Sequence, residues 1–99
     1  MYSKLTYSFN AKLWRYSGES GWHFVSIPKG ISKEIRNILQ REEEGWGRLK
    51  ATARIHQNEW RTAIWYDTKL GTYLLPIKAK IRAKERIIDG DSISIILIV

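Results

Sequence analysis

The chain has 99 residues, of which 43% are hydrophobic, and its 17 lysines and arginines against 10 acidic residues give a formal net charge of +7. This length and apolar content predict one folded domain, residues 1–99, and exclude intrinsic disorder. The sequence has no cysteine, which excludes disulfides, thiolate zinc sites and cysteine nucleophiles.

Residues 1–4, Met-Tyr-Ser-Lys, lack the apolar run of a signal peptide, and the longest apolar run, residues 95–99, is too short to span a bilayer. We therefore expect a cytoplasmic protein with no membrane partner. The basic balance favours a polyanion such as nucleic acid as partner, and it also serves to keep a small domain soluble.

The first quarter of the chain predicts two strands. Residues 4–13 alternate polar and apolar side chains, which is typical of a half-buried strand. Residues 17–21 form a loop, and the aromatic and β-branched run 22–27 predicts a second strand that Pro28 ends.

A helix is expected next, over residues 31–39, because apolar side chains recur on one helical face. Those residues are Ile31, Ile35, Ile38 and Leu39. Ser32 is expected to be the N-cap, with Glu34 in the first turn, and the helix ends by Gly45.

Residues 48–56 predict a strand with one small apolar face and one basic face. The basic face carries Arg48, Lys50, Arg54 and His56. Residues 57–59 form a turn, and residues 60–66 return as the hairpin partner.

The last third predicts a short strand over 72–75, a helix and a final strand. Basic residues occupy every second position from 78 to 86, but Ala79, Ala83 and Glu85 favour a helix and Pro76 suits a helix start. After a turn at 89–91, residues 92–99 form the last strand. Ile96 and Ile98 lie on its outer face, so we expect a helix or a second subunit to cover them.

The two halves of the sequence are similar. Each contains two strands, a proline, a helix and a further strand, and Pro28 and Pro76 lie 48 residues apart. This predicts an internal duplication.

Several pieces of the sequence resemble a known family. They are residues 9–14, residues 21–28, Trp60-Arg61-Thr62, and residues 73–78 with Arg82 and the Gly90-Asp91 turn. Together they resemble the family catalogued as domain of unknown function 1905, across nearly the whole chain. The resemblance implies a mainly β fold, a small closed barrel that we expect to have six or seven strands and two short helices, and it implies no activity. Ala63 departs from the family, which often has a serine there, so any role of that hydroxyl is absent here.

The second half, residues 75–82 and 89–93, is also similar to the swapped-hairpin barrels of AbrB-type regulators and MazE-type antitoxins. Those proteins dimerise to close one barrel and bind DNA through basic residues. If the duplication holds, this chain contains both halves and needs no dimer to close its barrel. Similarity of fold does not carry function, so DNA binding is a hypothesis here.

Motifs for catalysis are absent from the sequence. His23 and His56 are the only histidines and lack metal-ligand spacing, and there is no nucleophile elbow or phosphate-binding loop. We therefore expect a protein that is not an enzyme, with no catalytic residue, metal or cofactor.

The leading functional hypothesis is a non-enzymatic binding module for nucleic acid. Ten of the 17 basic residues fall between Arg48 and Arg86, and Trp14, Tyr16 and Trp65 are expected nearby. The expected contact residues are Arg48, Lys50 and Arg54 on the strand and Lys78, Arg82 and Arg86 on the helix. Positive charge beside aromatic faces is what binders of single-stranded nucleic acid use.

Two alternatives remain open. One is a small-molecule or peptide binder whose barrel mouth is lined by Trp22, Trp60 and Tyr73. The other is a protein that homodimerises through the face with Ile96 and Ile98, so we expect a monomer or a homodimer. The basic residues also fit a hydrated surface, and the tryptophans fit the core or rim of a small barrel.

Overall fold

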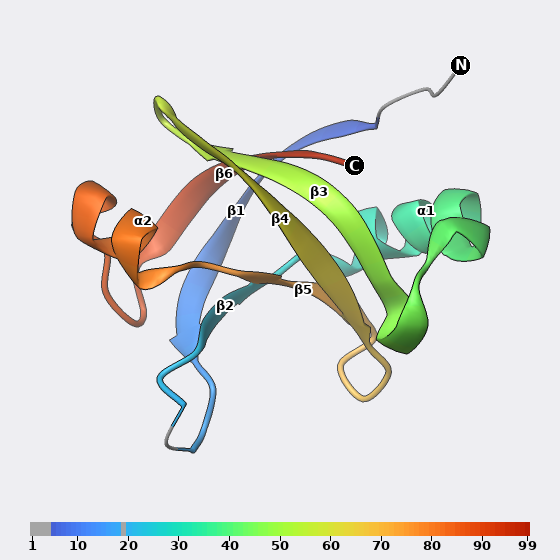
Figure 1. Ribbon diagram of the computed structural model, residues 1–99, viewed down its shortest axis with the longest axis horizontal. Coiled ribbons are helices and arrows are strands. Elements are labelled where there is room, and N and C mark those ends of the chain that lie inside the picture. The colour runs from blue at the N-terminus through green and yellow to red at the C-terminus, as the bar shows by residue number, and fades with distance from the viewer. Residues whose placement is uncertain (1–4, 19) are drawn as a thin grey trace.

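Six strands close into one barrel in the computed structural model, which describes residues 5–18 and 20–99 (Figure 1). The strands are β1 (Thr6–Arg15), β2 (His23–Ser26), β3 (Arg48–Ile55), β4 (Asn58–Asp67), β5 (Thr72–Pro76) and β6 (Ser92–Ile98). The helices are α1 (Lys29–Leu39) and α2 (Ala79–Glu85), with short 3-10 turns at Gln40–Glu42 and Gly45–Gly47. The prediction of a mainly β, closed barrel with two short helices is confirmed, and the barrel has six strands.

Several sequence-based predictions involve residues outside the described ranges, and one is the strand predicted over 4–13, which begins at Lys4. The expectation that the chain lacks a leader rests on Met1, Tyr2, Ser3 and Lys4, and the predicted loop 17–21 contains Glu19. Among the described helices, none has the length and apolar character that crossing a membrane requires.

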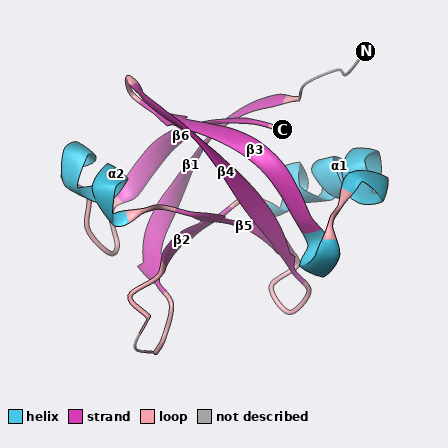
Figure 2. Ribbon diagram, in the orientation of Figure 1, coloured by secondary structure: helices cyan, strands magenta, loops and turns pink. Residues whose placement is uncertain are grey.

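The order around the barrel is β1-β2-β5-β4-β3-β6, and every neighbouring pair is antiparallel. The two helices lie at opposite sides of the barrel in Figure 2. Alternating side chains from all six strands fill the interior. The core includes Leu13, Val25, Ala53, Ile55, Ile64, Tyr73, Leu75, Ile95 and Leu97.

Helix α1 begins three residues before the predicted N-cap. Pro28 is the cap residue, with φ −48° and ψ 145°, and it presets the extended backbone from which the helix starts. Ser32 is fully buried inside the helix, where its Oγ donates to Ile27 O at 3.0 Å and accepts from Tyr73 N at 3.0 Å. The prediction of Ser32 as cap is therefore wrong, because its hydroxyl satisfies two buried backbone groups, one just after β2 and one on β5.

Glu34 also lies beyond the first turn, against the prediction, because the helix starts at Lys29. Its carboxylate instead accepts a hydrogen bond of 2.6 Å from the Tyr7 hydroxyl. This contact joins α1 to β1, and burial together with Glu34 raises the pKa of Tyr7 to about 12.

The predicted β3–β4 hairpin is confirmed. Ile55 pairs with Asn58, so the loop is the two residues His56 and Gln57, and His56 takes the left-handed conformation with φ 53°. This tight turn fixes the register of both strands, and hence which of their side chains share the outer face.

The predicted similarity of the two halves appears in the backbone. Lys29 and Ala79, the first residues of α1 and α2, are 50 positions apart. Two matching hydrogen bonds of 2.9 Å join the halves, from Ile27 N to Tyr73 O and from Ile77 N to His23 O. The match of Pro28 to Pro76 is wrong by two residues, because Pro28 occupies the helix cap position that Lys78 has in the second half.

Candidate functional site

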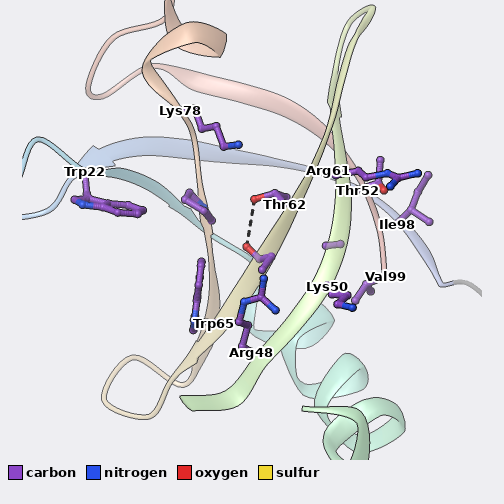
Figure 3. A pocket seen from close by; sticks show the side chains of 13 residues that line it. Trp22, Arg48, Lys50, Thr52, Arg61, Thr62, Trp65, Lys78, Ile98 and Val99 are labelled. Carbon is purple, nitrogen blue, oxygen red and sulfur yellow. Dashed lines mark hydrogen bonds between the residues drawn. The ribbon is translucent and has the colours of Figure 1, made fainter. Parts of the chain in front are cut away.

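An open groove of about 760 Å³ runs across the outer face of β3 and β4 (Figure 3). Four basic side chains line it, and its described lining contains no aspartate or glutamate. They are Arg48, Lys50, Arg61 and Lys78. Trp22 and Trp65 line the same groove, which we call the basic groove.

Strand register explains why the basic side chains meet there. Arg48, Lys50 and Thr52 alternate with buried residues on β3, so they lie outside the barrel. Opposite them on β4 are Trp65, Ala63 and Arg61, respectively. The small side chain of Ala63, which is 3% exposed, leaves a hollow between two large neighbours.

The aromatic side chains extend the groove toward the β1–β2 hairpin. The Arg48 guanidinium lies 5.8 Å from the ring centroid of Trp65, within cation–π range. Trp22 is 51% exposed and stacks on Phe24, with ring centroids 5.9 Å apart and an interplanar angle of 14°. The ring centroid of Phe24 also lies 5.3 Å from that of Trp14 and 6.2 Å from that of Tyr16. We call Trp14, Tyr16, Trp22 and Phe24 the aromatic band.

An acidic residue competes for one groove cation. Glu44 accepts a hydrogen bond from Arg48 and forms an ion pair with it, and the two side chains are 52% and 37% exposed. Such an exposed pair contributes at most about 1 kcal/mol to stability. Part of the Arg48 charge is therefore neutralised by the protein itself.

The structure brings three of the six predicted contact residues together, namely Arg48, Lys50 and Lys78. Arg82 lies in an adjoining smaller depression that shares Trp22 and Lys78 with the groove. Arg54 is in a separate depression beside His56, where its Nε donates to His56 O at 2.8 Å. Arg86 is exposed at the end of α2.

The three residues predicted to line a barrel mouth lie in three different environments. Trp22 lines the basic groove. Trp60 is half-buried in another depression beside α2. Tyr73 is fully buried in the core, and its hydroxyl donates to Glu43. Burial, together with the nearby Glu43 carboxylate, raises the pKa of Tyr73. The structure therefore does not join these three side chains into one pocket.

A polar cluster attaches the β3–β4 hairpin to α2. His56 Nδ1 lies 2.5 Å from Glu85 Oε1, and Asn58 donates to the other carboxylate oxygen. His56 is 78% exposed, whereas Glu85 is only 9% exposed. The hydrogen bonds from His56 and then from Asn58 lower the pKa of Glu85.

The apolar side chains on the outer face of β6 are only partly exposed to solvent. Ile96 and Ile98 are both half-buried, and each lines a depression. Ile98 contributes to the basic groove, so this residue belongs to the candidate site.

Arg61 and Ala63 are site residues that the residue pattern of a single strand does not predict. Both lie on β4, and their place in the groove depends on the register between β4 and β3. The signal that could have found them is the two-residue turn at His56 and Gln57. Counting back from this turn pairs Arg61 with Thr52 and Ala63 with Lys50.

The fold and the groove define a small closed β-barrel of two similar halves with a basic, aromatic-edged outer surface. The family model described as domain of unknown function (DUF1905) matches residues 9–97. The chain therefore belongs to this family. No curated protein shows significant similarity to the chain.

Proposed function

We propose that this protein is a non-enzymatic binding module that holds nucleic acid in the basic groove. The observation that carries the proposal is the convergence of four cations in one groove whose described lining has no aspartate or glutamate. Phosphates neutralised by such cations release condensed counterions, which is the main source of affinity for nucleic acid. A nucleic-acid ligand also fits the cytoplasmic location that the sequence predicts.

A comparison of the two halves supports a role for these cations beyond the fold. Arg61 on β4 pairs with Thr52 on β3. The equivalent pair is Asn10 on β1 and Ser94 on β6. By the same correspondence, Ser92 stands at the place of Lys50. Pro28 and Lys78 are both helix caps.

At these positions the equivalent surface therefore has neutral residues. Lys12 stands there where the groove has Ala63, and Arg54 and His56 line the depression beside Asn10 and Ser94. The barrel does not require the charges of the groove, so they are free to serve a ligand.

The test is fluorescence anisotropy of labelled oligonucleotides at low and near-physiological salt. The logarithm of the affinity should fall linearly with the logarithm of the salt concentration. Lys50→Glu should weaken binding by about tenfold and reduce the salt slope by about 1 or more.

Lys12→Glu is the matched control, because it makes the same charge change on an exposed strand position outside the groove. It should change the affinity by no more than about twofold, through long-range charge alone. Absence of binding at low salt would contradict the proposal, as would equal losses in the two variants.

A further inference from the structure

The two halves differ at one tryptophan in a way that points to a ligand. Trp14 pairs with Phe24, and Trp65 pairs with Leu74, which is 50 positions after Phe24. Trp14 and Trp65 are thus equivalent. The ring centroid of Trp14 lies 5.3 Å from that of Phe24 and 6.5 Å from that of Tyr16, and its Nε1 donates to Ser26 Oγ at 3.1 Å.

Trp65 has no such hydroxyl opposite. The residue 50 positions after Ser26 is Pro76, whose side chain has neither a donor nor an acceptor. Among the described residues, no hydrogen-bond partner is found for Trp65 Nε1, and the ring lines the basic groove. The half-buried Trp65 ring therefore offers a ligand the part that lines the groove, beside the Arg48 guanidinium 5.8 Å from its centroid.

The two tryptophans and the outer cations occupy different ends of the basic groove. Figure 3 shows Trp22 and Trp65 toward one end, Arg61 and Lys50 toward the other, and Arg48 beside Trp65. Trp22 uses one ring face against Phe24 and is half-exposed on the rest. Beyond Trp22 the aromatic band continues to Tyr16, which is 52% exposed.

We infer that the ligand is a single-stranded polynucleotide, with phosphates on the groove cations and bases stacked on Trp65 and Trp22. This inference rests on the proposed function and narrows it. Stacking on an aromatic ring needs a base face that is not already stacked on its neighbours, and only a single strand offers it. In a duplex the base faces cover one another, and a protein reads base edges in the grooves instead.

The aromatic band makes the site longer than one nucleotide. A strand that leaves the basic groove past Trp22 next meets Tyr16 on the same side of the β1–β2 hairpin. Affinity should therefore rise with the length of the oligonucleotide until the band is filled, and level off after that.

The first test compares oligothymidylate and oligouridylate with a duplex of the same length. The single strands should bind at least tenfold more tightly than the duplex, and they should quench the intrinsic tryptophan fluorescence. Equal or tighter binding of the duplex would overturn this inference and leave the proposed function standing. If none of the three oligonucleotides binds, both this inference and the proposed function are overturned.

The second test separates stacking from charge. Trp22→Leu and Trp65→Leu should each weaken single-strand binding about tenfold while the salt slope stays unchanged, because neither removes a charge. Trp65→Phe should recover part of the loss, since it keeps an aromatic face. Trp46→Leu is the control, because this side chain is 92% exposed and does not line the groove. Wild-type affinity of Trp22→Leu and Trp65→Leu, or an equal loss in Trp46→Leu, would overturn the inference.

Discussion

Lys50 lies directly across from Ala63 on the outer face of β3 and β4, and this pairing of a long and a short side chain creates the hollow of the basic groove. The equivalent pair between β6 and β1 is Ser92 and Lys12, with the long side chain on the other strand. Filling the hollow therefore tests the site without altering charge. Ala63→Ile should weaken oligonucleotide binding about tenfold, with a stability cost within about 3 kcal/mol.

Ala63→Ser is the control for that variant, because it keeps the side chain small. It should bind oligonucleotides within about twofold of wild type, since it preserves the hollow. Anisotropy gives the affinities, and urea unfolding confirms that both variants are folded. If Ala63→Ile binds as tightly as Ala63→Ser, the ligand does not enter the groove.

The ion pair between Glu44 and Arg48 predicts a variant that binds more tightly. Glu44→Gln frees the Arg48 guanidinium for phosphate, so the affinity should rise about two- to fivefold at low salt and less at high salt. Glu42→Gln removes the same charge from an exposed position and should raise the affinity less. Equal gains in the two variants would show that only net charge matters.

The contact between Glu85 and His56 predicts a pH-dependent stability. Because the pKa of Glu85 in the folded protein lies below its ordinary value of about 4.5, the carboxylate stabilises the folded state above that pH. This stabilisation is lost as the pH falls through the folded-state pKa. Glu85→Gln should therefore lower the free energy of unfolding at neutral pH, and its difference from wild type should shrink below pH 4.5.

Urea unfolding over a pH series measures that difference. Glu59→Gln, on the same hairpin but exposed, should show little effect at any pH. A loss in Glu85→Gln that stays constant with pH would indicate a packing defect and contradict the electrostatic account.

Tyr73 predicts a variant that loses stability but not binding. Tyr73→Phe keeps the buried ring and removes the hydroxyl that donates to Glu43, so the free energy of unfolding should fall by about 1–3 kcal/mol. Tyr7→Phe removes a more exposed hydroxyl from Glu34 and should cost less. Oligonucleotide affinity should be unchanged in both variants. A weaker affinity of Tyr73→Phe at full folding would favour a site near the core.

Hydropathy alternation alone predicts much of the barrel, because a strand with one buried face has a period of two. This pattern predicts strands over residues 4–13 and 48–56, and the structure has β1 (Thr6–Arg15) and β3 (Arg48–Ile55) there. The start of α1 differs from the prediction because Pro28 and Ser32 both suit the cap of a helix and are only four residues apart. Pro28 is the cap, and the hydroxyl of Ser32 instead bonds Ile27 O and Tyr73 N.

The site was less predictable than the fold because it depends on register. Arg48 and Lys50 could be found as outward residues of one strand, but Arg61 joins them only through pairing with Thr52. Arg54 shares their face of β3 and still lies in another depression, because its paired residues are Glu59 on β4 and Ile96 on β6 and neither is a cation. Tyr73 was assigned to a mouth, and its place in the core follows from barrel closure between β2 and β5.

A heteronuclear NMR titration of the labelled protein with a short single-stranded oligonucleotide is the most direct test of whether a single strand binds in the basic groove. The sequence has five tryptophans, so each indole N–H can report separately on its surroundings. We expect the largest chemical-shift changes at the Trp22 and Trp65 indoles and at the backbone amides of Lys50, Arg61 and Ala63. The indole resonances of Trp46 and Trp60 should not shift. Shifts centred on Arg54 and Arg86, or no shifts at low salt, would contradict it.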